Sequence, residues 1–262
     1  MRALMLCVIA IIVSIPGVAV AQACRAPAVL TDTVHGFKYC ALPQYKTVVD
    51  SVLQKLRGEV TAAKASGRLV IYLSTPISPR GGGIEKINIQ VAASVRARLE
   101  KSLGPGVWVL DPGASQFPRT GNTEAGGGDY MVMFTHLLAG ADGMGNDFDM
   151  AYFTGPSDMR AFFGCTGEDV IGCLTRWLAA RATTDPDIKK VADDPALRRA
   201  FLRYYAMRAS VVFSSGCHDE WNIFVRINNK RRLGEQVAVW FDNRPASPAE
   251  MVVEVSPGYE VR

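Results

Sequence analysis

The expected fold follows from the residues between Ser210 and Phe241. This stretch reads SVVF at 210–213, SSGCHDE at 214–220, WNIFVRINNK at 221–230 and QVAVWF at 236–241. The first run is short, apolar and β-branched, which is typical of a buried strand. A polar turn follows, and Trp221, Phe224 and Val225 then have the spacing of a helix with one buried face. The last run predicts a second strand, and ligands of such α/β sheets bind where strands end and helices begin.

The same alternation of strand and helix precedes this stretch. Apolar runs at 69–73, 107–110 and 148–153 predict three more strands, and helical spacing covers 45–64 and 84–103. Most of 158–207 is expected to be helical, with a capping Asp before Pro at 185–186 and at 194–195. The predicted fold class is α/β: a flavodoxin-like three-layer sandwich with a five-stranded parallel sheet, order 2-1-3-4-5, and a helical insertion before the fourth strand.

The domain organisation starts from a predicted signal peptide at 1–23. Arg2 precedes an apolar run, and Ala21-Gln22-Ala23 offers small residues for cleavage, so we expect a periplasmic or secreted protein with no stable membrane insertion after cleavage. A lipid anchor on Cys24 and an uncleaved N-terminal anchor are the alternatives. Residues 24–262 are expected to form one α/β domain: an N-terminal extension and helix at 24–64, the core sheet at 69–241, and a C-terminal extension at 243–262. That extension adds a short edge strand at 251–255 in this prediction.

Composition limits the function classes. The 262 residues are 48% apolar and 21% charged, with a formal net charge of +4, as in a globular protein with a sizeable core. Lysine and arginine form no long run, so we expect no nucleic-acid partner. The oligomeric state is not indicated. No metal or other cofactor is expected, because the three histidines lack the spacing of metal ligands.

The expected export affects how the cysteines are predicted to pair. An oxidising compartment favours disulfides, and the close pairs Cys24–Cys40 and Cys165–Cys173 give the simplest connectivity. Cys217 is then left over in the polar turn. It is either a reactive thiol or an inert, partly buried one.

The loop at 74–83, STPISPRGGG, follows the first strand and precedes a helix. Backbone N–H groups in such a loop favour an anion, and Ser74, Thr75, Arg80 and Gly81 are the expected binding residues. The other interpretation is a plain flexible connection. Asp158, after the third strand, either reaches the same crevice or simply caps a helix.

Glu220 is the strongest catalytic candidate. We expect it in a first helical turn, where the helix dipole favours an ionised carboxylate. Such a carboxylate can attack a sugar carbon or stabilise a cationic transition state. The alternative is that this acid only stabilises the helix start, as acidic residues in first turns commonly do.

Two motifs resemble the nucleoside 2-deoxyribosyltransferase family and its nucleotide N-hydrolase relatives. VIYLSTPIS at 70–78 is similar to the family's opening strand and loop, and SSGCHDE at 214–220 is similar to its Asp-Ser-Gly-Thr-x-x-Glu signature, with Ser215, Gly216 and Glu220 in register. The resemblance implies a flavodoxin-like sheet. It also implies that Glu220 takes the deoxyribosyl group from the base, that Tyr72 orients Glu220, and that Gly216 lets the backbone approach the sugar.

Two departures separate the chain from that family. Ser214 stands where the family has Asp, and Cys217 stands where it has Thr. The expected function is an exported N-glycosidase or deoxyribosyl-transferring enzyme that acts on a nucleoside- or nucleotide-like substrate through a carboxylate, without a cofactor. The alternative is a non-catalytic periplasmic ligand-binding or structural protein that retains the fold.

Overall fold

The structure is a computed structural model, and it describes residues 24–209 and 214–262. The predicted signal peptide at 1–23 and the predicted strand at 210–213 lie outside these described residues. None of the helices in the described part of the chain combines the length and the apolar character that crossing a bilayer requires.

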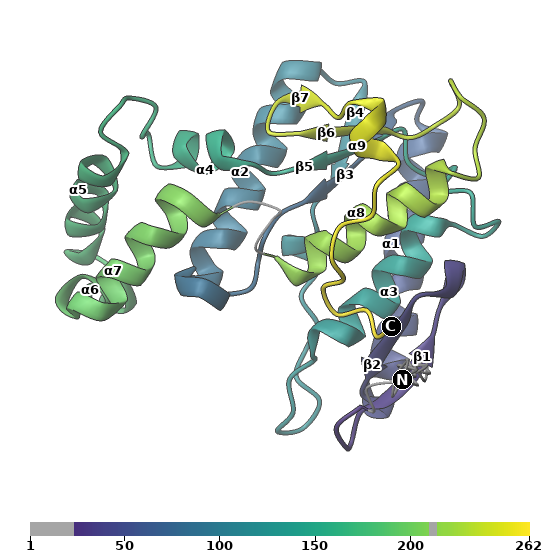
Figure 1. Cartoon of the computed structure of the whole chain (residues 1–262), viewed down its shortest axis with the longest axis horizontal. Coiled ribbons are helices and arrows are strands. Elements are labelled where there is room, and N and C mark those ends of the chain that lie inside the picture. The colour runs from purple at the N-terminus through teal and green to yellow at the C-terminus, as the bar shows by residue number, and fades with distance from the viewer. Residues whose placement is uncertain (1–23, 210–213) are drawn as a thin grey trace, which may run out of the picture.

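A mixed α/β sheet of five strands forms the centre, in the order β4-β3-β5-β6-β7 (Figure 1). The strands are β3 (Leu69–Ser74), β4 (Val107–Leu110), β5 (Met150–Phe153), β6 (Ala238–Phe241) and β7 (Arg244–Pro245). The first four run parallel, but β7 pairs antiparallel with β6. The prediction of a purely parallel sheet is therefore wrong. Only Asp242 and Asn243, both with positive φ, separate the last two strands, and so short a connection can make only an antiparallel pair.

Nine α-helices accompany the sheet in the described residues. They are α1 (Lys46–Ala65), α2 (Glu85–Leu103), α3 (Gly127–Ala139), α4 (Pro156–Phe162), α5 (Val170–Ala182), α6 (Pro186–Asp193), α7 (Pro195–Arg203), α8 (Ser215–Asn228) and α9 (Pro248–Met251). Asp185 and Asp194 cap α6 and α7 by accepting backbone N–H bonds, and proline occupies the first turn of both helices, as predicted.

The two faces of the sheet carry separate cores. Along β3, Val70 and Tyr72 belong to the core that α1, α3 and α8 cover, whereas Ile71 and Leu73 belong to the core of α2, α4 and the insertion α5–α7. This division follows from the alternation of side chains along a strand. Figure 1 shows α5, α6 and α7 as a group that extends to one side of the sheet.

The N-terminal extension forms a hairpin of β1 (Val29–Asp32) and β2 (Lys38–Ala41). Both predicted disulfides are present: Cys24–Cys40 closes this hairpin, and Cys165–Cys173 joins the end of α4 to α5. Among the cysteines that the structure describes, Cys217 has no disulfide partner, and it is buried. Two disulfides are compatible with a secreted protein.

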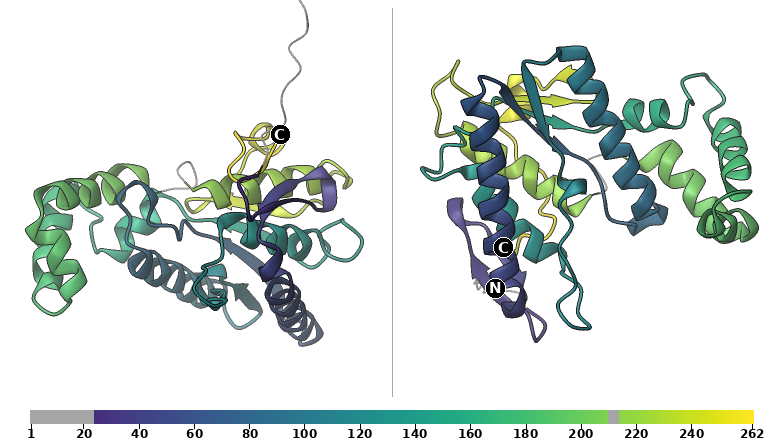
Figure 2. Two further views of the ribbon diagram at one scale, coloured as in Figure 1. Left: turned by 90° about the horizontal axis from the view of Figure 1, so that it is seen from below. Right: turned by 180° about the vertical axis from the view of Figure 1, so that it is seen from behind.

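Beyond α9 the chain continues as an extended segment, residues 252–262, which we call the C-terminal strap. The predicted edge strand at 251–255 is wrong. Instead, Asn222 of α8 bonds both backbone groups of Val255, and the strap ends by pairing with β2 through Val261 N–H and Lys38 O, 2.8 Å apart. Figures 1 and 2 show the strap running along α8 towards the β1–β2 hairpin. The side chains of α8 satisfy its backbone, so it needs no partner strand.

Candidate active site

Glu220 reaches the site from the second turn of α8. Ser214 is the N-cap, and its hydroxyl accepts the N–H of Cys217 at 3.3 Å. The helix therefore begins at Ser215, and the expectation that Glu220 lies in the first turn is wrong. The polar segment that we predicted as a turn is itself helical, because Ser is a strong N-cap and the residues after it have no helix-breaking proline.

Two hydroxyl groups from one strand hold the Glu220 carboxyl. Tyr72 Oη donates to Oε1 at 2.8 Å, and Ser74 Oγ donates to Oε2 at 2.5 Å. The two donors are two residues apart on β3, so they project from the same face of the sheet. Tyr72 is fully buried, and the rings of Phe134, Phe148 and Phe224 surround it with centroids 5.8–6.0 Å away. Aromatic packing thus fixes the ring that orients the acid.

Burial controls the protonation of Glu220. The residue is 6% exposed, and this desolvation raises its pKa to about 7, although the bonds from Ser74 and Tyr72 oppose the rise. The charge of Asp219 adds to it. The expectation that the helix dipole keeps the carboxylate ionised is therefore wrong. Near neutral pH the acid and its conjugate base are both present in quantity.

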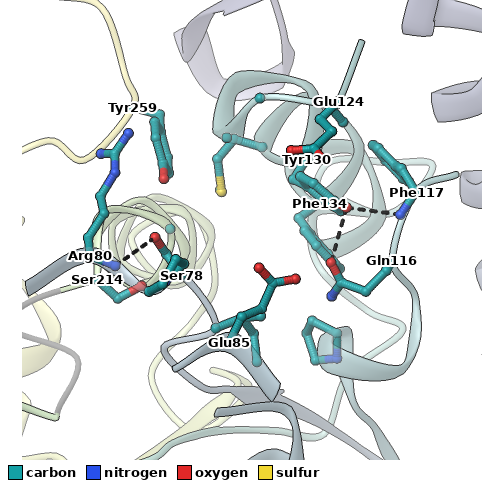
Figure 3. A pocket seen from close by; sticks show the side chains of 18 of the residues that line it. Ser78, Arg80, Glu85, Gln116, Phe117, Glu124, Tyr130, Phe134, Ser214 and Tyr259 are labelled. Carbon is teal, nitrogen blue, oxygen red and sulfur yellow. Dashed lines mark hydrogen bonds between the residues drawn. The ribbon is translucent and has the colours of Figure 1, made fainter. Parts of the chain in front are cut away.

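Glu220 is one of the residues that line a pocket of about 520 Å³, a volume that suits a small molecule. Stacked rings form one wall: Phe117 and Tyr130 lie 4.2 Å apart between centroids. The Tyr130 hydroxyl donates to Gln116 Oε1 at 3.1 Å and accepts the N–H of Phe117 at 2.9 Å. Figure 3 shows Arg80 and Tyr259 on the opposite side of the pocket from this wall.

The structure brings most of the predicted site residues together. Thr75, Arg80, Gly216 and Glu220 line the pocket. Tyr72 and Ser74 are buried beneath it as the partners of Glu220, so they act through the acid.

Besides Ser74, three more predicted binding residues do not line the pocket. Gly81 lies beside the Tyr204 ring, and the backbone carbonyl of Ser215 packs closely under Gly258 of the strap. Asp158 belongs to the opposite face of the sheet: it accepts the N–H of Gly155 at 3.0 Å and forms a 2.6 Å ion pair with Arg98. It is a helix cap, because these donors already occupy its carboxylate.

Several pocket residues were not predicted from the sequence. No motif in the segment that forms α3 indicated that Tyr130, Met131 and Phe134 would face a pocket. Glu85 and Gln116 sit in segments with no motif. Tyr259 lies in the C-terminal extension, where no periodic pattern marks any residue as part of a site.

Neither metal binding nor thiol chemistry is indicated here. In residues 24–209 and 214–262, no group of three or more His, Cys, Asp or Glu side chains is arranged to hold a metal ion. Cys217 is 2% exposed, and burial raises the pKa of its thiol. A buried, protonated thiol is inert, which favours the structural interpretation of this residue.

A scan of the chain against protein-family models found no match, and comparisons with curated proteins and with solved structures found none either.

Proposed function

We propose that this chain is an exported N-glycosidase or deoxyribosyl-transferring enzyme that acts on a nucleoside- or nucleotide-like substrate through Glu220. The observation that carries the proposal is that Glu220 lines the pocket while Tyr72 and Ser74 hold both oxygens of its carboxyl group. A fixed, partly desolvated carboxylate beside a small-molecule pocket is the arrangement that nucleophilic glycosidases use.

The proposed reaction has two steps. The ionised Glu220 carboxylate attacks C1′ of the sugar, forming a C–O bond while the C–N bond to the base breaks. The base leaves with the electron pair of that bond and takes a proton from solvent. A water molecule, or a second base, then attacks C1′ and restores the carboxylate, giving the free sugar or a new nucleoside.

Two hydroxyl donors and the burial of the acid act on its ionisation in opposite directions. The bonds from Tyr72 and Ser74 stabilise the ionised acid, which keeps a usable fraction of nucleophile at neutral pH. They also fix both oxygens, so the attacking atom is oriented before the substrate arrives. The burial that opposes ionisation makes the carboxylate poorly solvated and therefore more reactive.

The rest of the pocket supports a substrate with a planar ring. The stacked pair of Phe117 and Tyr130 offers an apolar wall, and Gln116 adds polar atoms near its edge. Across the pocket, the loop of Ser78 and Arg80 supplies polar and cationic groups for a hydroxyl or an anion. A flavodoxin-like arrangement of the sheet and the resemblance to nucleoside 2-deoxyribosyltransferases also favour a nucleoside-like substrate.

The test is the release of free base. The mature protein is incubated with a panel of ribo- and deoxyribonucleosides and their 5′-phosphates, and the bases are separated by liquid chromatography. A second base added in excess distinguishes transfer from hydrolysis. Glu220→Gln should abolish release, whereas the exposed control Glu59→Gln should not. If no compound of the panel releases its base between pH 6 and pH 9, the proposal is contradicted.

A second candidate function is binding without catalysis. It is favoured by Ser214, which stands at the pocket where the resembling family has an acid. In that case calorimetry should detect nucleoside binding while chromatography detects no product. If the wild type and Glu220→Gln bind the nucleoside equally, the Glu220 carboxyl group does not contribute to ligand recognition.

A further inference from the structure

Asp219, the neighbour of Glu220, holds the C-terminal strap. The Asp219 side chain is fully buried, and its carboxylate accepts three consecutive backbone N–H groups: Gly258 at 2.8 Å, Tyr259 at 2.7 Å and Glu260 at 3.2 Å. Consecutive residues of a helix point in different directions, so Glu220 faces β3 while Asp219 faces the strap. One turn of α8 thus connects the acid to the end of the chain.

Other contacts fix the strap on both sides of Asp219. Trp221 Nε1 donates to Val253 O at 3.2 Å. Arg226 forms ion pairs with Glu254 at 2.6 Å and with Glu260 at 2.9 Å. Arg226 is only partly exposed, and charge-assisted bonds of this kind are stronger than neutral ones. The strap is therefore docked along most of its length, although it contains no regular secondary structure.

The docked strap places Tyr259 in the pocket, where three segments meet. The guanidinium carbon of Arg80 lies 5.3 Å from the ring centroid of Tyr259, within the range of a cation–π contact. The ring also covers Gly127 at the start of α3, where a Cβ atom would lie 2.1 Å from Tyr259 Cζ. Only glycine at 127 leaves room for this ring. At Gly258 a Cβ would lie 1.7 Å from the carbonyl oxygen of Ser215, so glycine is also needed for the strap to approach α8.

We propose that Tyr259 determines specificity as an aromatic wall of the pocket for a planar nucleobase, and that Asp219 is the positioning residue that holds this wall through the strap. This inference rests on the proposed function, because it assigns the ring to the base of that substrate. The three bonds of Asp219 can form only when the last residues of the chain are docked. The pocket is therefore complete only when the strap is docked, and loss of the strap removes base recognition while the Tyr72–Glu220–Ser74 group remains.

The first arm of the test needs no ligand. Asp219→Asn replaces one accepting oxygen with an N–H₂ donor, which cannot accept from the strap backbone. Amide hydrogen exchange followed by mass spectrometry should show at least tenfold faster exchange of a peptide covering 256–262 than in the wild type. Val253→Ala, a change at an exposed side chain of the same strap, is the matched control and should leave this exchange unchanged. Unchanged exchange in Asp219→Asn overturns its positioning role.

The second arm measures ring recognition in a Glu220→Gln parent, so that turnover cannot interfere. Calorimetry with adenosine should give affinities about 5- to 150-fold weaker when Tyr259→Ala is added, the range for loss of one base-stacking ring. Tyr259→Phe keeps the ring and should bind as the parent does. Gly127→Ala, whose added Cβ would overlap the Tyr259 ring, should weaken binding like Tyr259→Ala.

A double-mutant cycle separates positioning from general destabilisation. If Asp219 acts through Tyr259, Asp219→Asn should weaken adenosine binding in the parent and have no further effect once Tyr259→Ala is present. Additive losses contradict the coupling. Equal binding by Tyr259→Ala and the parent, or no adenosine binding by the parent, contradicts the aromatic wall. Adenosine binding by the parent without base release by the wild type refutes only the proposed catalysis.

Discussion

Replacing Glu220 with glutamine should stabilise the protein at alkaline pH. The buried carboxyl group has a pKa of about 7, raised from 4.5 mainly by desolvation. Between these two values the folded protein keeps a proton that the unfolded chain releases, so the stability of the wild type falls as the pH rises. A shift from 4.5 to about 7 corresponds to a loss of about 3 kcal/mol that is complete above pH 7. Glutamine fills the same volume, can still bond with Tyr72 and Ser74, and does not ionise.

Urea unfolding at two pH values measures this effect. The free energy of unfolding is determined by linear extrapolation at pH 4.5 and pH 8 under non-reducing conditions, for the wild type and for Glu220→Gln. The stability of the variant relative to the wild type should increase by about 3 kcal/mol between these pH values. The exposed control Glu59→Gln should stay within about 0.5 kcal/mol of the wild type at both. A Glu220→Gln variant whose relative stability does not change with pH would refute the burial argument.

Three other predictions use the same structure. Base release should rise with pH through about 7, because the proposed nucleophile is the ionised form of Glu220 and burial raises its pKa to that value; a rate that falls over this range would argue for an acid instead. Tyr72→Phe removes a bond that lowers this pKa, so the rising limb should move to higher pH, and an unmoved limb would show that the hydroxyl does not act on the acid. Replacing both Cys165 and Cys173 with serine opens a loop with a sequence separation of 8, and urea unfolding should show a loss of about 2.5 kcal/mol; no loss would mean that this loop is already constrained in the unfolded chain.

Local signals in the sequence predicted most elements of the fold. The apolar run at 107–110 became β4 without change, and the Asp-Pro pairs marked the starts of α6 and α7. These signals succeed because a buried strand or a capped helix depends on residues that are neighbours in the chain. One error concerned the residue at which a predicted helix begins. The segment at 214–220 looks polar and turn-like, but Ser214 caps a helix that begins directly after it.

Elements whose structure depends on distant partners were predicted poorly. Residues 251–255 have the composition of an edge strand, yet α8 binds their backbone through its side chains and β7 already occupies the edge of the sheet. Asp158 has the right position after a strand to reach the pocket. Arg98 and Tyr152 bond it on the other face, and no local pattern identifies such partners.

Patterns in the sequence predicted the alternation of strands and helices, gave both disulfide pairs as the simplest connectivity, and marked Glu220 and Tyr72 as residues to test. The folded chain was needed to show that Tyr72 and Ser74 bond the same carboxyl group, that burial rather than the helix dipole sets the pKa of that group, and that the C-terminal strap supplies Tyr259 to the pocket. The reason is physical: periodicity and capping are properties of neighbouring residues, whereas desolvation and hydrogen bonding across 146 or 148 positions depend on which surfaces the folded chain brings into contact.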